Sequence, residues 1–140
     1  MKIFSIFAAL LLSITAAAQI KLVPHSISLK SGRSVTLNAP ADFEIIPAAE
    51  GLTRVRFFAK SPDGRIFVTD MRDLTENKRG SVYILDGFDA AKGKFARVIK
   101  YMSGLHNPNS CQFYRDAAGQ DWFYLAETDK LTRRRANSLV

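Results

Sequence analysis

The chain lacks a second cysteine, a long hydrophobic run beyond its first residues and any window with a useful helical period. Because Cys111 is the only thiol in 140 residues, no disulfide can form within the chain. We expect Cys111 to be a buried small hydrophobe, the alternative being a reactive thiol. The sequence also contains no metal-ligand spacing, no nucleophile–base pair and no phosphate-binding glycine loop, which excludes the motif-bearing enzyme classes.

The first residues have the pattern of an export signal. Lys2 precedes an apolar run over residues 3–14, and three alanines at 16–18 fit a signal peptidase site. This pattern predicts a signal peptide over residues 1–18. The alternative is a transmembrane anchor, but the run is short for a bilayer span. We therefore expect a secreted or periplasmic chain with no membrane span.

The net charge of +7 has a strong contribution from one cluster near the C-terminal end, formed by Lys130, Arg133, Arg134 and Arg135. Such a cluster can attract polyanions. No aromatic residues alternate with it for stacking on bases, so we expect no nucleic-acid partner. We interpret residues 132–140 as an irregular basic tail at the point where a longer protein has been truncated.

Between these ends the sequence is a succession of short segments rich in β-branched and aromatic residues, which predicts an all-β fold. Clusters of Gly, Pro, Asn and Asp separate the segments, as expected for tight turns. The predicted strands cover residues 33–37, 43–48, 55–60, 65–70, 81–86, 96–102, 110–114 and 122–127.

Three elements recur in the same order along the chain. The segment DFEIIPAAEGL (42–52) matches KFARVIKYMSGL (94–105), and each is followed by an aromatic strand, a glycine turn and a strand that ends on an acid, Asp70 or Glu127. Four short strands per repeat of this length are typical of a β-propeller blade. We expect a lead-in over residues 19–41 and a partial β-propeller of about two four-stranded blades over residues 42–131, with the remaining blades missing.

The acids at the strand ends allow two interpretations. Asp70 and Glu127 each lie beside a loop, where a carboxylate commonly accepts hydrogen bonds from backbone N–H groups. We favour this turn-capping role over a role as ligands.

The repeat also resembles a known family. The stretches GLTRVRFFAKSPDGRIFVTD (51–70) and GSVYILDGFDAAKGKFARVIKYMSGLHNPNSCQFYRDAAGQDWFYLAETDKL (80–131) are similar to the opening blades of the glucose/sorbosone dehydrogenases. These are secreted or periplasmic six-bladed β-propellers that use pyrroloquinoline quinone. The resemblance implies that the parent protein oxidises a sugar substrate by hydride transfer to the quinone, with calcium polarising the quinone and a histidine acting as base.

The resemblance makes His106, in the loop segment GLHNPNS, the candidate catalytic base. Many family members carry the histidine after the proline of this loop, where this chain has Asn109, and the alternative is that His106 is an ordinary loop residue. His25 has no candidate partners and is expected at the surface. The groups that hold pyrroloquinoline quinone and calcium would belong to blades absent from the chain, so we expect neither to bind these residues alone.

These observations lead to one expected function and two alternatives. We expect the N-terminal portion of an exported quinone-dependent sugar dehydrogenase that is inactive alone. The first alternative is a non-enzymatic secreted β-propeller that acts as an interaction module. The second is a small basic protein whose tail binds polyanions.

Overall fold

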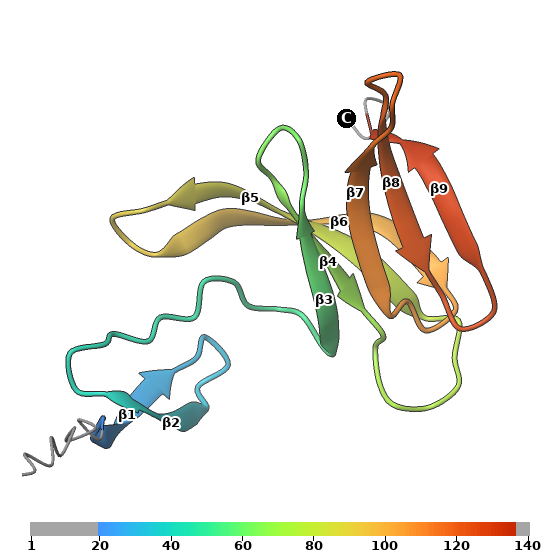
Figure 1. Cartoon of the computed structure of the whole chain (residues 1–140). Coiled ribbons are helices and arrows are strands. Elements are labelled where there is room, and N and C mark those ends of the chain that lie inside the picture. The colour runs from blue at the N-terminus through green and yellow to red at the C-terminus, as the bar shows by residue number, and fades with distance from the viewer. Residues whose placement is uncertain (1–19, 137–140) are drawn as a thin grey trace, which may run out of the picture.

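The computed structural model describes residues 20–136, and every regular element among them is a β-strand. The prediction of an all-β fold is confirmed. No helix in this described range is long and apolar enough to cross a membrane. The nine strands of Figure 1 are β1 (Leu22–Ser28), β2 (Ser34–Pro40), β3 (Val55–Lys60), β4 (Ile66–Asp70), β5 (Gly80–Asp89), β6 (Lys94–Leu105), β7 (Ser110–Arg115), β8 (Asp121–Ala126) and β9 (Leu131–Arg135).

The strands form three antiparallel sheets in which each strand pairs with the next one along the chain. The orders are β1–β2, β3–β4–β5–β6 and β7–β8–β9. The β1–β2 hairpin lies apart from the two larger sheets and is joined to them by an extended segment (Figure 1). The larger sheets meet mainly through their first strands, β3 and β7. The first of these sheets therefore has the four strands expected of one blade, and the second sheet has three described strands.

One five-residue turn is used in three hairpins, at residues 29–33, 61–65 and 116–120. In each, the N–H of the first residue donates to the carbonyl of the fifth, at 2.8–3.0 Å. The fourth residue is always glycine, with φ of +80° at Gly32, +89° at Gly64 and +79° at Gly119. This left-handed backbone carries no steric cost for glycine, which explains why the sequence repeats a glycine at this position.

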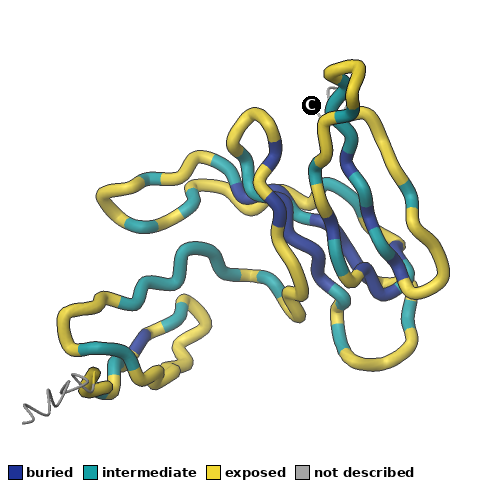
Figure 2. Tube along the Cα trace, viewed as in Figure 1, coloured by how far each residue is buried: buried dark blue, intermediate teal, exposed yellow. Residues whose placement is uncertain are grey.

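The core lies where the two larger sheets face each other (Figure 2). Phe67 of β4 is completely buried at its centre. Its ring packs edge-on against Tyr101 at 5.6 Å and against Phe113 at 5.0 Å, and it is tilted against Phe123 at 5.4 Å between centroids. Because these partners come from β6, β7 and β8, one side chain holds both sheets together.

Two sequence predictions about strands are wrong. Residues 43–48 form no strand, because the segment has no neighbouring strand to pair with among residues 20–136 and Pro47 lacks a backbone donor. The irregular tail predicted over residues 132–140 is wrong for residues 132–135, which belong to β9 and pair with β8. The guanidinium groups of Arg133 and Arg135 lie 4.3 and 5.9 Å from the Trp122 ring, so the arginine run is suited to a strand.

The N-terminal region also differs from the prediction. The expected lead-in contains a complete hairpin, whose first strand β1 was missed because Pro24 interrupts its alternating pattern. Proline is compatible with a strand whose outer edge is unpaired, and here β1 pairs only with β2 in the described part of the chain. The predicted signal peptide, residues 1–18, lies outside the residues that the structure describes.

Replacing Phe67 by Ala should lower the free energy of unfolding by about 3–5 kcal/mol, because the change leaves a cavity between the sheets. Urea denaturation followed by tryptophan fluorescence measures the change. The matched control is Phe88→Ala: that side chain is 56% exposed, and its loss should cost much less. Equal losses in the two variants would contradict the placement of the core.

Candidate functional site

Three loops gather at one end of the two larger sheets, which we call the loop end (Figure 1). They are the β4–β5 loop (residues 71–79), the β6–β7 loop (106–109) and the β8–β9 loop (127–130). An antiparallel meander returns every second connection to the same end of its sheet. The fold therefore brings together residues that are up to 59 positions apart in the sequence.

Asp70, at the end of β4, fixes the backbone that leads into β3. It is 2% exposed. Its carboxylate accepts the N–H of Thr53 at 2.7 Å, of Arg54 at 2.9 Å and of Arg72 at 2.8 Å, and the hydroxyl of Thr53 at 2.8 Å. Burial acts to raise the pKa of Asp70, but these donors together lower the pKa below its ordinary value. Asp70 is thus a carboxylate held by backbone donors.

Glu127 plays the equivalent part in the second sheet. Its side chain is 3% exposed, and Oε2 accepts the N–H of His106 at 2.7 Å. Oε1 lies 3.4 Å from the ammonium of Lys130. Both acids therefore bind backbone just after a Gly-Leu pair, which confirms the turn-capping interpretation. The same contact places His106 in the loop.

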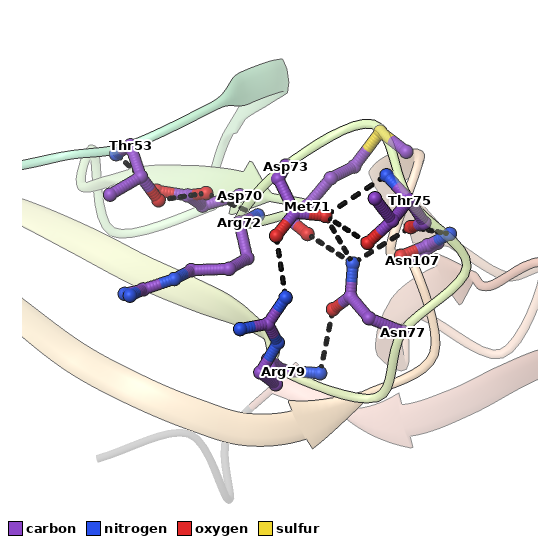
Figure 3. Close-up of polar contacts among 9 residues, drawn as sticks. All are labelled: Thr53, Asp70, Met71, Arg72, Asp73, Thr75, Asn77, Arg79 and Asn107. Atoms are coloured by element: carbon purple, nitrogen blue, oxygen red, sulfur yellow. Dashed lines mark hydrogen bonds and ion pairs between the residues drawn. The ribbon is translucent and has the colours of Figure 1, made fainter.

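The β4–β5 loop is held by its own polar side chains (Figure 3). Asp73 accepts the N–H of Thr75 at 2.9 Å and the amide of Asn77 at 3.0 Å, and it pairs with Arg79 at 2.6 Å. The side-chain amide of Asn107, in the β6–β7 loop, donates to the Thr75 carbonyl at 3.1 Å. The two loops are therefore bound to each other.

The β6–β7 loop also packs closely against Gly80, the first residue of β5. A Cβ atom at this position would lie 2.1 Å from Cδ of Pro108, so only glycine fits. Asn107, just before this proline, has a positive φ of +43° and is 6% exposed. The β6–β7 loop is thus seated tightly on the start of β5.

His106 lies between two carboxylates from different loops. Its Nδ1 is 3.1 Å from Oδ2 of Asp129, in the β8–β9 loop, and its Nε2 contacts Oε1 of Glu76, in the β4–β5 loop. The imidazole is 16% exposed, whereas the Glu76 side chain is 68% exposed. The carboxylate of Asp129, and then that of Glu76, raises the pKa of His106 above its ordinary value; Nδ1 meets Asp129 as an ion-pair contact and not as an aligned hydrogen bond. This arrangement favours the imidazolium form and orients the ring.

Asn109 occupies the position where the resembled family often has its histidine. Its side-chain oxygen accepts Nε–H of Arg56 at 3.2 Å, and its carbonyl accepts the hydroxyl of Thr69 at 3.2 Å. Its own N–H donates to the carbonyl of Ala126 at 2.9 Å. In this chain Asn109 joins the two sheets, and His106 lies three residues before it.

The remaining sequence candidates have no catalytic surroundings. Cys111 is 8% exposed in the core, and burial raises the pKa of its thiol to about 11, so it is a small buried residue as expected. Nε2 of His25 lies 3.2 Å from the carbonyl of Pro40, within the β1–β2 hairpin. Within residues 20–136, no three or more His, Cys, Asp and Glu side chains are grouped so that they could hold a metal ion.

The sequence analysis selected His106 as a candidate but named neither of the two carboxylates that contact it. Asp129 is two positions after the recognised acid Glu127, and Glu76 lies in a polar stretch between two strands. The feature that could have identified Glu76 and Asp129 is their place in loops that lie at the same end of the sheets as the β6–β7 loop. Comparisons with protein-family models, with curated proteins and with solved structures found no match.

We predict that Asp70→Asn destabilises the fold at neutral pH, by about 1–3 kcal/mol, because a buried acceptor of backbone donors is weakened. The pKa of Asp70 is lower when folded, so its contribution is present above the unfolded value of 3.8 and is lost as the pH falls through the folded value. Urea unfolding of both proteins at pH 7 and pH 3 should show the difference shrinking in acid. Asp42→Asn, on an exposed turn outside the sheets, serves as control; a pH-independent difference would contradict the assignment.

We predict that Asp129→Asn lowers the pKa of His106 and that Glu76→Gln lowers it as well, because each of these carboxylates raises it. The imidazole proton shifts in an NMR titration report this value directly. Any stabilisation from the charged ring is present below its unfolded pKa and is lost as the pH rises through the raised folded value. Asp121→Asn removes a carboxylate that pairs with Arg115 and should leave the His106 titration unchanged.

Proposed function

We propose that the two larger sheets are adjacent blades of a β-propeller. The proposal is supported by the repeated order of strands, by the equivalent caps at Asp70 and Glu127 and by the shared turns at residues 61–65 and 116–120. It is also supported by the contact between β3 and β7, the first strands of the two sheets. Neighbouring blades of a propeller pack face to face in this way around a central axis.

We further propose that this propeller is that of an exported quinone-dependent sugar dehydrogenase, and that its loop end receives the sugar. The observation that carries this proposal is the Asp129–His106 pair, with 3.1 Å between the carboxylate and Nδ1. A carboxylate on one imidazole nitrogen sets the tautomer and orientation of the ring, which leaves the other nitrogen for proton transfer. The substrate class, a sugar, is taken from the resemblance of residues 51–70 and 80–131 to the glucose/sorbosone dehydrogenases.

His106 would act as the catalytic residue through Nε2. Glu76 contacts this nitrogen from an exposed side chain, so a sugar hydroxyl can replace it with the loss of one further contact, the 3.4 Å hydrogen bond that Oε2 of Glu76 accepts from the Asn107 amide. The neutral ring then accepts the hydroxyl proton while Asp129 stabilises the imidazolium that forms. Glu127 holds the backbone of His106 throughout.

Pyrroloquinoline quinone supplies hydride acceptance in the resembled family, and calcium assists it. The residues described here do not fit a calcium site, because no suitable ligand group forms among residues 20–136. The proposal therefore assigns both groups to other blades and gives these two blades the proton-transfer residue.

A second candidate function is a non-enzymatic interaction module. It is favoured by the engagement of both ring nitrogens of His106, which makes the residue a cross-link between the β4–β5 and β8–β9 loops. In this case His106 contributes to stability and has no chemical role.

A pH profile distinguishes the two candidates. The complete propeller that contains this chain, supplied with pyrroloquinoline quinone and calcium, should reduce a dye in the presence of aldoses. Because the base must be neutral, the rate should rise as the pH passes the raised pKa of His106. In Asp129→Asn this limb should move to lower pH, and in His106→Asn the rate should fall at least about 100-fold. Full activity of His106→Asn with reduced stability would favour the interaction module.

A further inference from the structure

We propose that a cleft at the β1–β2 turn binds an organic monocarboxylate, whose charge is held by Lys30 and Arg33 and whose apolar chain packs on the opposite wall. The cleft lies between this turn and the extended segment that leads to β3 (Figure 1), and its volume is about 830 Å³. Small-molecule sites commonly have volumes of roughly 300–1,000 Å³. Apart from Val55, all of the lining residues precede the first strand of the proposed blades. The site therefore goes beyond the proposed function and does not depend on it.

The turn at residues 29–33 presents an arginine that lacks the partner found in an equivalent turn. At residues 61–65 the fifth residue, Arg65, pairs at 2.6 Å with the carboxylate of the third residue, Asp63. Arg33 is the fifth residue of its own turn, but the third residue there is a serine. The two turns share their backbone hydrogen bonds, so this difference lies in the side chains. The missing carboxylate leaves a guanidinium group at the cleft with which a ligand can pair.

Lys30 adds a second cation to the same side of the cleft. In the part of the chain that the structure describes, the side chains of Lys30 and Arg33 form no ion pair or hydrogen bond, and both residues are exposed. The acid among the described lining residues is Glu50, on the opposite wall, and its Oε2 accepts the backbone N–H of Lys30 at 2.8 Å. This bond fastens the turn to the extended segment. Two cations and one carboxylate leave a net positive charge, which a single carboxylate of a ligand would balance.

The remaining walls of the cleft are mainly apolar. The apolar lining residues are Leu29, Pro47, Ala49, Leu52 and Val55. Each CH₂ group of a ligand that leaves water for such a surface tightens binding about threefold to fourfold. Arginine, in turn, holds a carboxylate through two parallel N–H donors. A ligand with one carboxylate and an aliphatic chain therefore matches both parts of the cleft, whereas an inorganic anion matches only its cations.

The test is an NMR titration of the purified chain with octanoate, in which the backbone amide signals are followed. We expect the signals of residues 29–33 and 49–52 to move and to saturate with one dissociation constant, while those of the 61–65 turn stay in place. Hexanoate should bind about tenfold more weakly than octanoate, because two fewer CH₂ groups are buried. Acetate keeps the charge without the chain, and octanol keeps the chain without the charge, so both should bind much more weakly.

Arg33→Gln should weaken octanoate binding about tenfold, and Arg33→Lys should weaken it less, because lysine keeps the charge but not the two parallel donors. Lys21→Gln is the matched control: it removes the same charge from the far end of the same hairpin and should leave the affinity unchanged. Circular dichroism of each variant distinguishes loss of binding from unfolding.

The monocarboxylate site would be overturned by the absence of saturable shifts or by octanol binding as tightly as octanoate. Acetate binding as tightly as octanoate would indicate an adventitious ion only, with the same consequence. Unchanged affinity in Arg33→Gln would place the carboxylate elsewhere and would also overturn the assignment. Signal changes spread over both larger sheets would indicate binding to exposed apolar surface in general, and the cleft would again lose its role.

Discussion

The structure depends on one repeated constraint, a buried carboxylate at the end of the second strand of a sheet that binds the backbone entering the first strand of the same sheet. Asp70 accepts hydrogen bonds from Thr53 and Arg54, just before β3, and from the N–H of Arg72, and Glu127 accepts the N–H of His106. Burying a charge without such partners would be costly, so each acid holds its loop in a single arrangement. Where the capped loop carries a candidate site residue, as at His106, the cap also determines the position of that residue.

The caps and the aromatic core act on the same strands. β4 carries both Phe67, which packs against the second sheet, and Asp70, which binds the segment leading into β3. Thr69 lies between them and donates to the carbonyl of Asn109 across the interface. Because these contacts follow one another along a single strand, the relative position of the sheets and the position of the loop end are set together.

Much of this fold could be predicted from the sequence, because period-two patterns and glycine turns are local. The predicted strand over residues 55–60 coincides with β3, and those around 65–70, 110–114 and 122–127 need only small corrections at their ends. The strand prediction for residues 43–48 was wrong because an apolar alternating segment becomes a strand only when the edge of a sheet is available for pairing. The prediction of an irregular tail was wrong for the arginines of β9. The guanidinium group of Arg133 lies over the Trp122 ring, so this charged run is accommodated in a sheet.

The candidate site was less accessible to prediction, because its partners meet only through the topology. His106 was identified from its loop, but the pairing with Asp129 depends on the β8–β9 connection returning to the same end. That pairing has a chemical consequence. A carboxylate that orients the ring also raises its pKa, so in the proposed enzyme the same contact would prepare Nε2 for proton transfer and would shift that transfer to higher pH. Under the same proposal, displacement of the exposed Glu76 side chain by a ligand would determine whether the ring acts as a cross-link or as a base.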